Sequence, residues 1–251
     1  MDTTKELPTV ISFCSGYGGI ERGLDLAGIK HRVIAYVEIE AFAIANLVAK
    51  MEEGTLDPAP IFTDLKTFPA HLFRDCVDII TGGYPCQPFS MAGDRKGTDD
   101  PRHLWPYIRE HVNAIRPTRV FFENVQGHIS LGLSTVISDL EEDGFKTTWG
   151  IFSACEVGAP QERKRVFILA DTDDTFSKRE SLSCRVVEEH TDANSGCTQS
   201  GRFTSQQWLC EPSVARVVDG SPYRVDRHRL LGNAVVPQTA AKAWQVLSQK
   251  F

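Results

Sequence analysis

Short apolar runs rich in β-branched residues alternate with amphipathic helical stretches through the first two-thirds of the chain. The predicted strands are residues 9–13, 32–37, 77–81, 119–122, 147–153 and 165–170. The predicted helices are residues 18–27, 40–51, 104–115 and, near the end of the chain, 235–247. Because parallel neighbouring strands need a crossover connection that is usually a helix, this alternation is typical of a mostly parallel sheet with helices on both faces. The predicted fold class is therefore α/β.

The character of the sequence changes after residue 170. Residues 171–201 are rich in Ser, Thr, Asp and Glu and lack sustained periodicity, which is typical of loops or a small irregular lobe. At 251 residues, the chain is long enough for one α/β core with such a lobe and too short for two large domains. We therefore predict one domain made of residues 1–170 and completed by 230–251, with residues 171–229 as a separate small region.

The composition argues against several classes of protein. No apolar run approaches the ~18 residues that span a bilayer, and the polar N-terminus lacks the pattern of a secretory signal, so we expect a cytoplasmic protein without membrane contact. The seven cysteines include no Cys-x-x-Cys pair, so neither a disulfide framework nor a metal site is predicted. A net charge of −6 disfavours nonspecific coating of nucleic acid but allows local basic clusters, such as residues 163–165 and 224–229.

A glycine-rich turn joins the first predicted strand to the first predicted helix. It contains Ser15, Gly16, Gly18 and Gly19, and glycines at such a turn let the backbone approach a ligand closely. About 20 residues beyond this turn, Glu38 follows the second strand, where an acidic side chain can bind the hydroxyl pair of a ribose. The pattern fits a nucleotide-like cofactor, and the alternative is a plain tight turn.

A second acidic residue, Asp64, follows a third apolar segment at residues 61–62. Its carboxylate could accept a hydrogen bond from an adenine amino group. The alternative is an ordinary loop carboxylate.

The segment GGYPCQPFS, residues 82–90, follows a buried strand and contains Cys86 between two prolines. Cys86 therefore lies at the carboxyl edge of the sheet, where open α/β sheets bind ligands, in a loop that the prolines keep out of regular structure. A cysteine is more often a small buried residue than a nucleophile, so its neighbours matter. Glu123 follows the next strand, and Arg163 and Arg165 lie two residues apart, on one side of an extended segment.

Together these elements resemble the cytosine-5 DNA methyltransferase family. The similarity includes the glycine loop, Pro-Cys-Gln at 85–87, Glu-Asn-Val at 123–125, Gln-x-Arg-x-Arg at 161–165 and Gly-Asn-Ala-Val-Val at 232–236, all in the family's order. It covers nearly the whole chain except about residues 171–222. The resemblance implies a Rossmann-like sheet with helices on both faces and a small target-recognition lobe at residues 171–229. It also implies double-stranded DNA as the partner, and we expect a monomer.

The resemblance implies S-adenosylmethionine as the methyl donor, with no metal. The residues expected to bind it are Ser15, Gly16, Gly18, Gly19, Glu38, Ile39, Asp64, Leu65, Pro85, Leu104, Asn233 and Ala234. The catalytic residues are expected to be Cys86, Glu123, Arg163 and Arg165.

Carbon 5 of cytosine is a poor nucleophile until another group adds to carbon 6, and a thiolate can make that addition. We expect Cys86 to attack carbon 6 while Glu123, kept protonated by the site, donates to ring nitrogen 3. Arg163 and Arg165 are suited to holding the cytosine carbonyl oxygen and to favouring the thiolate. The base must first be rotated out of the duplex, and residues 91–103 are expected to close over the DNA.

Two departures from the family pattern affect these expectations. Cys14 stands where the family usually has a phenylalanine, which removes an expected stacking partner for adenine. The region after residue 170 is short, which implies compact recognition of the target sequence or sharing of that task with catalytic loops.

The alternative functions are a transfer-RNA methyltransferase with the same chemistry and a catalytically silent module that binds S-adenosylmethionine or DNA. A thiol hydrolase is disfavoured because no histidine pairs recognisably with Cys86.

Overall fold

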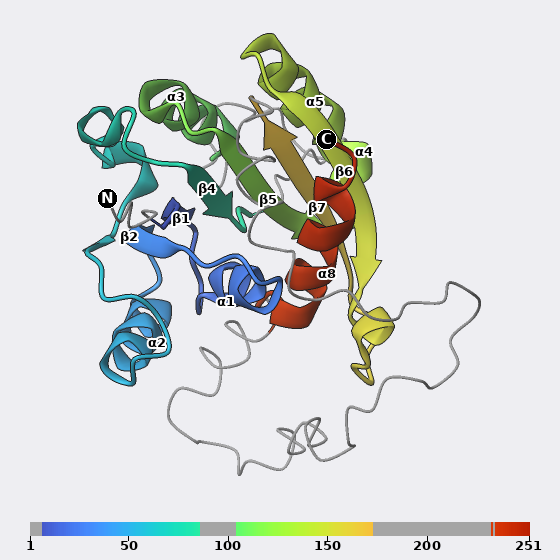
Figure 1. Cartoon of the computed structure of the whole chain (residues 1–251), viewed down its shortest axis with the longest axis horizontal. Helices are drawn as coiled ribbons and strands as arrows, with labels where there is room; N and C mark the ends of the chain where they lie inside the picture. The colour runs from blue at the N-terminus through green and yellow to red at the C-terminus, as the bar shows by residue number, and fades with distance from the viewer. Residues whose placement is uncertain (1–6, 86–103, 173–231, 233) are drawn as a thin grey trace, which may run out of the picture.

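The computed structural model describes residues 7–85, 104–172, 232 and 234–251 (Figure 1). Four of the expected features therefore lie outside the described residues. They are Cys86, the loop at residues 91–103, Asn233 and nearly all of the region expected to recognise the target, residues 171–229.

A seven-stranded sheet forms the centre of the molecule, in the order β3-β2-β1-β4-β5-β7-β6. The strands are β1 (Thr9–Phe13), β2 (Arg32–Val37), β3 (Ile61–Phe62), β4 (Ile79–Gly82), β5 (Arg119–Val125), β6 (Lys146–Ser153) and β7 (Lys164–Asp171). The first five strands pair in parallel, whereas β7 runs antiparallel to both of its neighbours, β5 and β6. The predicted α/β class with a mostly parallel sheet is confirmed.

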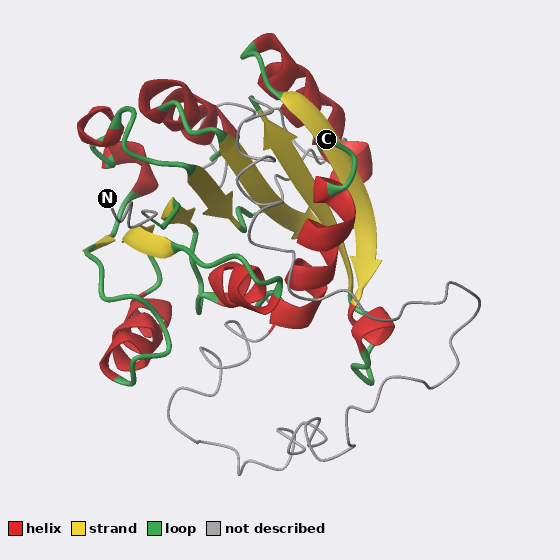
Figure 2. Cartoon of the chain, viewed as in Figure 1, coloured by secondary structure: helices red, strands yellow, loops and turns green. Residues whose placement is uncertain are grey.

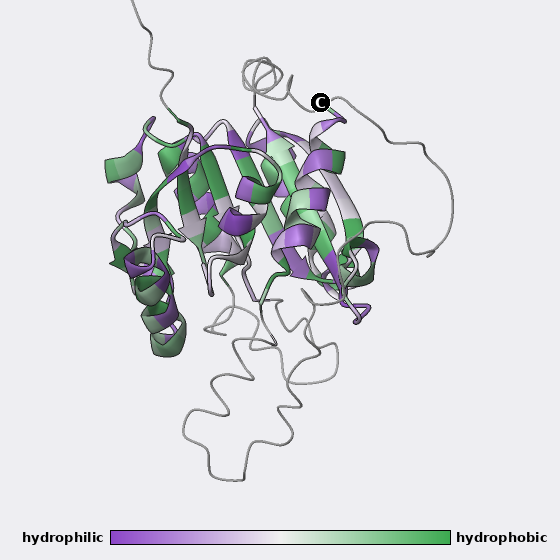
Figure 3. Cartoon of the chain, turned by 60° about the horizontal axis from the view of Figure 1, so that its bottom comes forward, coloured by the Kyte–Doolittle hydropathy of each residue, from purple (hydrophilic) through white to green (hydrophobic). Residues whose placement is uncertain are grey.

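Helices cover both faces of this sheet (Figure 2). The helices are α1 (Gly19–Leu26), α2 (Ala41–Glu52), α3 (Trp105–Ile115), α4 (His128–Leu131), α5 (Leu133–Glu142) and α8 (Pro237–Ser248), with short 3-10 turns at Leu65–Thr67, Ala70–Phe73 and Ala154–Val157. One apolar core joins the sheet to α3 and α5 through residues such as Ile108 and Val136. The other joins it to α1 and α8 through residues such as Leu24 and Trp244. Figure 3 shows hydrophobic colours along the strands and hydrophilic patches on the helices, as expected for such a layered fold.

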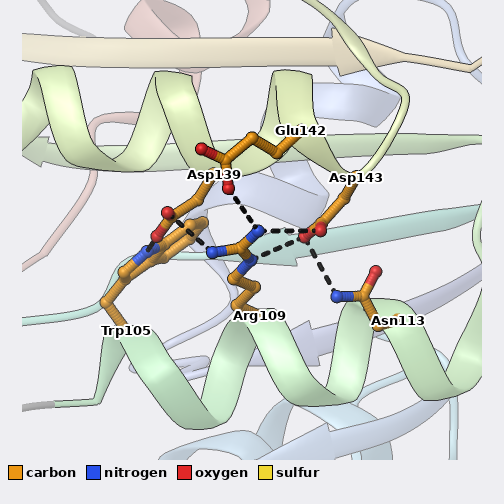
Figure 4. A network of polar contacts seen from close by, with 6 residues as sticks. All are labelled: Trp105, Arg109, Asn113, Asp139, Glu142 and Asp143. Atoms are coloured by element: carbon orange, nitrogen blue, oxygen red, sulfur yellow. Dashed lines mark hydrogen bonds and ion pairs between the residues drawn. The ribbon is translucent and has the colours of Figure 1, made fainter.

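Polar contacts also tie α3 to α5 (Figure 4). The guanidinium of Arg109 contacts three carboxylates on or just after α5, with nitrogen-oxygen distances of 2.7 Å to Asp139, 3.1 Å to Glu142 and 2.8 Å to Asp143. The indole N–H of Trp105 donates to a second oxygen of Asp139 at 2.6 Å. These contacts hold the first turn of α3, which begins just after the segment containing Cys86, against α5.

Most expected elements occur within two residues of their predicted bounds. No helix was predicted between residues 123 and 146, where the structure has α4 and α5. The strand predicted at residues 119–122 continues to Val125, so Glu123 lies within β5 rather than after it. The last strand, predicted to end at residue 170, continues to Asp171. The side chain of Asp171 is buried and pairs with Arg119 Nε at 2.9 Å, so this residue belongs to the core rather than to the following polar region.

In the described residues, no helix is both long enough and apolar enough to cross a membrane.

Candidate functional site

A cavity of about 770 Å³ opens at the carboxyl edge of the sheet, at the ends of β1, β2, β4 and β5. Parallel strands bring the turns that follow them to one edge, which explains why segments far apart in the sequence meet here. The expected residues that line the cavity are Ser15, Gly16, Gly19, Glu38, Ile39, Asp64, Leu65, Pro85, Leu104, Glu123, Arg165 and Ala234. Cys14, Tyr17 and Asn124, to which the sequence analysis gave no binding role, line it as well.

The glycine-rich turn contacts the end of β2 directly. The backbone N–H of Gly16 donates to Glu38 Oε2 at 2.7 Å, and the hydroxyl of Ser15 donates to the carbonyl of Ser12 at 2.9 Å. Gly18 is not among the cavity-lining residues; it precedes α1 with φ of +79°, a conformation that favours glycine. The turn is therefore held by hydrogen bonds from Ser15 and Gly16 and by the left-handed backbone conformation of Gly18.

Glu38 is 7% exposed, and both of its carboxylate oxygens accept backbone hydrogen bonds. Besides the bond from Gly16, Oε1 accepts from the N–H of Glu40 at 2.9 Å. A carboxylate oxygen has two lone pairs, so each can still accept a hydrogen bond from a ligand hydroxyl. The two backbone bonds hold the carboxylate in one orientation at the cavity wall.

Asp64 caps the short 3-10 turn that follows β3, where its Oδ1 accepts from the N–H of Lys66 at 2.9 Å. Its neighbour Leu65 is buried, whereas Ile39 is 71% exposed at the rim of the cavity. Asp64 thus has a local structural role as well as a position on the cavity wall.

Glu123 lies near the end of β5, where the antiparallel direction of β7 brings a cation beside it. The first residues of β7 pair with the last residues of β5, in a register that pairs Val125 with Arg165. The Nε atom of Arg165 lies 2.8 Å from Glu123 Oε1. A parallel strand would have brought its other end to this edge, so the charge pair depends on the reversed direction of β7.

The Glu123 carboxyl is 6% exposed, and burial raises its pKa from 4.5 to about 7. The cations of Arg165 and Arg163 oppose this rise, because they favour the ionised form. A carboxyl with a pKa near neutrality can donate its proton to a bound ligand at one step of a reaction and take it back at a later step.

Arg163 has other partners. It is not among the residues that line the cavity, and its Nη2 atom donates to the backbone carbonyls of Gly232, at 2.8 Å, and of Ala234. Its guanidinium therefore contacts the C-terminal segment, which itself forms part of the cavity wall. The sequence pattern indicated a cation here but gave no information about the carbonyls that it meets.

Two polar contacts next to the Pro-Cys-Gln segment were not anticipated. Asn124 Nδ2 donates to the carbonyl of Tyr84 at 3.1 Å, and the Tyr84 hydroxyl lies 3.1 Å from Nε2 of His128. Both the backbone and the side chain of Tyr84 are thus fixed immediately before Pro85. The only signal for Asn124 in the sequence was its position next to Glu123, and His128 carried none.

An acidic residue after β2, a glycine turn after β1 and a buried acid-cation pair near the end of β5 line one cavity at the carboxyl edge of the sheet, where α/β proteins of the nucleotide-binding class bind their ligands. A family model for C-5 cytosine-specific DNA methylases matches residues 8–204. The chain therefore belongs to this family, as its motifs indicated.

Curated relatives are similar over about two-thirds of the chain. Type II methyltransferase M.NaeI of Lentzea aerocolonigenes is 31% identical over 165 residues, which cover 64% of this chain and 39% of the relative. Type II methyltransferase M.NgoMIV of Neisseria gonorrhoeae is 31% identical over 166 residues, which cover 64% of this chain and 51% of the relative. The chain therefore spans about half the length, or less, of the curated relatives that it matches.

Solved structures share the fold. The S. pombe Dnmt2 methyltransferase superposes with a TM-score of 0.54 and 29% identity, over 65% of this chain and 50% of the other. DNMT2 of Spodoptera frugiperda superposes with a TM-score of 0.56 and 22% identity, over 66% of this chain and 50% of the other, a likeness that concerns the fold alone. The predicted methyltransferase-type α/β fold is confirmed.

Proposed function

We propose that the chain transfers a methyl group from S-adenosylmethionine to carbon 5 of a cytosine in DNA, with Cys86 as the covalent nucleophile. The observation that carries this proposal is the buried pair of Glu123 and Arg165, 2.8 Å apart, on the wall of a large cavity that Pro85 also lines. Pro85 precedes Cys86 in the sequence, so the thiol is one residue from a cavity that contains a proton donor and a cation.

The cavity fits the expected methyl donor in size and in chemistry. Its volume of about 770 Å³ is within the range of small-molecule sites, and its wall combines apolar side chains with acidic groups at Glu38 and Asp64. Glu38 would hold the ribose hydroxyls, and Asp64 would accept from the adenine amino group. When bound there, S-adenosylmethionine supplies a methyl group on a positively charged sulfur.

The chain's own residues prepare the cytosine. The Cys86 thiolate adds to carbon 6 and forms a carbon-sulfur bond, while Glu123 gives its proton to ring nitrogen 3. Arg165 balances the charge that Glu123 then carries, because its guanidinium contacts the same carboxylate. After carbon 5 has been methylated, a water molecule takes its proton, the electrons of that bond form the carbon 5–carbon 6 double bond, and the carbon-sulfur bond breaks to return the Cys86 thiolate. The nitrogen 3 proton then returns to Glu123.

The substrate is double-stranded DNA from which the target base is rotated out, because these atoms are inaccessible within a duplex. We assign target recognition to residues 171–229, and DNA backbone contacts to the basic cluster at residues 224–229. The bacterial Type II methyltransferases among the relatives support a role in a bacterial or phage-infected cytoplasm, and we propose that the chain acts there as a monomer on one site.

The test measures transfer of labelled methyl groups to unmethylated DNA by the wild-type protein and by Cys86→Ser. Cys76→Ser is the matched control, because Cys76 is an exposed free thiol outside the cavity. We expect Cys86→Ser to abolish transfer and Cys76→Ser to retain it. Near-normal product from Cys86→Ser would reject the covalent mechanism.

Two further measurements define the substrate and the proton donor. DNA that contains 5-fluorocytosine should become covalently trapped on the wild-type protein in the presence of S-adenosylmethionine, and transfer RNA offered as an alternative acceptor should not be methylated. Methylation of transfer RNA alone would replace the proposed substrate. Glu123→Gln should slow single-turnover methylation by about 100-fold, the typical contribution of a positioned proton donor.

A further inference from the structure

Three backbone carbonyls of the C-terminal segment are held by two side chains from distant parts of the chain. Arg163 Nη2 donates to Gly232 O at 2.8 Å and to Ala234 O, and the hydroxyl of Tyr17 donates to Val235 O. Tyr17 belongs to the glycine-rich turn after β1, and Arg163 immediately precedes β7. The segment is therefore fastened from two sides at the point where it lines the cavity.

The packing around this segment depends on close approach. A Cβ on Gly19 would lie 2.7 Å from the carbonyl oxygen of Val235, and a Cβ on Gly23 would lie 2.6 Å from the Cβ of Ala240. Figure 1 shows α8 beside α1, the two elements that these glycines bring together. The C-terminal segment therefore packs against the glycine-rich turn, in which Gly16 donates to Glu38. A shift of the segment would consequently shift the turn.

We propose that Arg163 and Tyr17 are positioning residues that clamp Gly232, Ala234 and Val235 as one wall of the S-adenosylmethionine site, and that Arg163 acts on cofactor binding rather than on the cytosine. This inference rests on the proposed function of the cavity. It separates the two arginines: Arg165 contacts Glu123 and lines the cavity, whereas the contacts of Arg163 hold Gly232 and Ala234, which line it. Both bonds come from the Nη2 atom of Arg163, and the flexible, strongly hydrated ammonium of a lysine would not hold a donor in that place as the planar guanidinium does.

The test uses Arg163→Lys and Tyr17→Phe, each of which removes clamp hydrogen bonds while keeping charge or ring. The matched controls are Arg22→Lys, where a half-exposed guanidinium pairs with Asp25 at 3.2 Å, and Tyr36→Phe, where a buried hydroxyl donates to the Asp57 carbonyl at 3.3 Å. Neither Arg22 nor Tyr36 lines the cavity. If Arg163→Lys fails to fold, Tyr17→Phe carries the test alone.

The first readout is hydrogen-deuterium exchange in the ligand-free protein. The amides of Thr239 and Ala240 bond to the carbonyl of Val236, directly after the clamped segment. We expect a peptide covering residues 234–242 to exchange at least about threefold faster in both clamp variants, because the start of α8 loses its anchor. A peptide covering residues 243–251 is the internal reference, since Trp244 and Leu247 remain in the core.

The second readout is calorimetric binding of S-adenosylmethionine and S-adenosylhomocysteine. Loss of one or two hydrogen bonds should raise Kd by about tenfold in Arg163→Lys and about threefold in Tyr17→Phe, whereas the controls should match the wild type. Single-turnover methylation at saturating cofactor should change much less than Kd. Wild-type exchange or wild-type Kd in both clamp variants would overturn the proposal.

One outcome would return Arg163 to the cytosine: an unchanged Kd together with a large loss of the saturated single-turnover rate in Arg163→Lys. Failure of the wild-type protein to bind either ligand would instead reject the proposed function. The exchange experiment would then still decide whether Arg163 and Tyr17 hold the segment, because it needs no ligand.

Discussion

Replacing Glu123 by glutamine should change how the stability of the protein depends on pH. The Glu123 pKa rises from 4.5 to about 7 in the folded chain, mainly because the carboxyl is buried. Each pKa unit corresponds to about 1.4 kcal/mol, so ionised Glu123 destabilises the fold by about 3 kcal/mol relative to the protonated form. Glutamine resembles the protonated carboxyl in shape and cannot ionise.

The sign of the effect follows from proton binding. Below pH 4.5 the carboxyl is protonated in both the folded and the unfolded chain, so it adds no pH dependence. Between pH 4.5 and 7 the unfolded chain ionises while the folded chain keeps its proton, so stability falls as pH rises. Above pH 7 both states are ionised, and the loss stays constant.

Urea denaturation of the ligand-free wild type and of Glu123→Gln at pH 5, 6, 7 and 8 measures this difference. The free energy of unfolding of the variant, relative to the wild type, should rise by about 2 to 3 kcal/mol from pH 5 to pH 8. All other titrating groups are common to both proteins and cancel in the comparison. A difference that stays constant across this range would show that Glu123 does not hold its proton near neutrality, and would refute its assignment as the proton donor.

Two further substitutions test buried polar contacts outside the Glu123–Arg165 pair, namely Arg119 with Asp171 and Tyr84 with His128. Asp171→Asn should lower the free energy of unfolding by about 3 to 5 kcal/mol, because it deprives the buried Arg119, which is 1% exposed, of its carboxylate partner. Urea denaturation measures this loss, and a loss below about 1 kcal/mol would contradict the prediction. Tyr84→Phe should destabilise the fold by about 1 kcal/mol through loss of the contact with His128 and should slow single-turnover methylation, since Tyr84 precedes the Pro-Cys-Gln segment. Wild-type stability and rate in Tyr84→Phe would show that the hydroxyl has no positioning role.

The sheet could be predicted well because its strands are short, apolar and bounded by turns. Residues 9–13 and 32–37 have the same bounds in the sequence analysis and in the structure, since their side chains are buried and their ends are polar or glycine-rich. The direction of β7 could not be predicted in this way. A strand that is buried on both faces has the same apolar pattern whether it runs parallel or antiparallel.

Two helices were missed for a related reason. In α5 the buried residues Leu133, Val136 and Leu140 have helical spacing, but β-branched Thr135 and Ile137 interrupt the strong helix formers around them. The preceding Gly132 also suggests a turn rather than a helix. Packing against α3 and the sheet outweighs these weak local preferences.

Most of the candidate site could be predicted because each residue lies near the end of a recognisable strand or just after it. Glu38, Asp64 and Glu123 all line the cavity in the structure, as strand order along the edge requires. The contacts of Arg163 could not be predicted, because backbone carbonyls of a segment about 70 residues away leave no mark on the residues that bind them. Side-chain chemistry indicates which group is present, whereas the partner depends on the tertiary fold.

The position of α8 has a consequence for the order of synthesis. On the ribosome, the seven strands emerge before Pro237–Ser248, so the sheet can assemble while its α1 face still exposes Leu24 and Phe121 to water. Only when α8 has left the exit tunnel can Trp244 and its neighbours cover that face, and Ala234 and Val235 reach the cavity at the same stage. A nascent chain stalled before this helix would therefore lack part of the cavity wall.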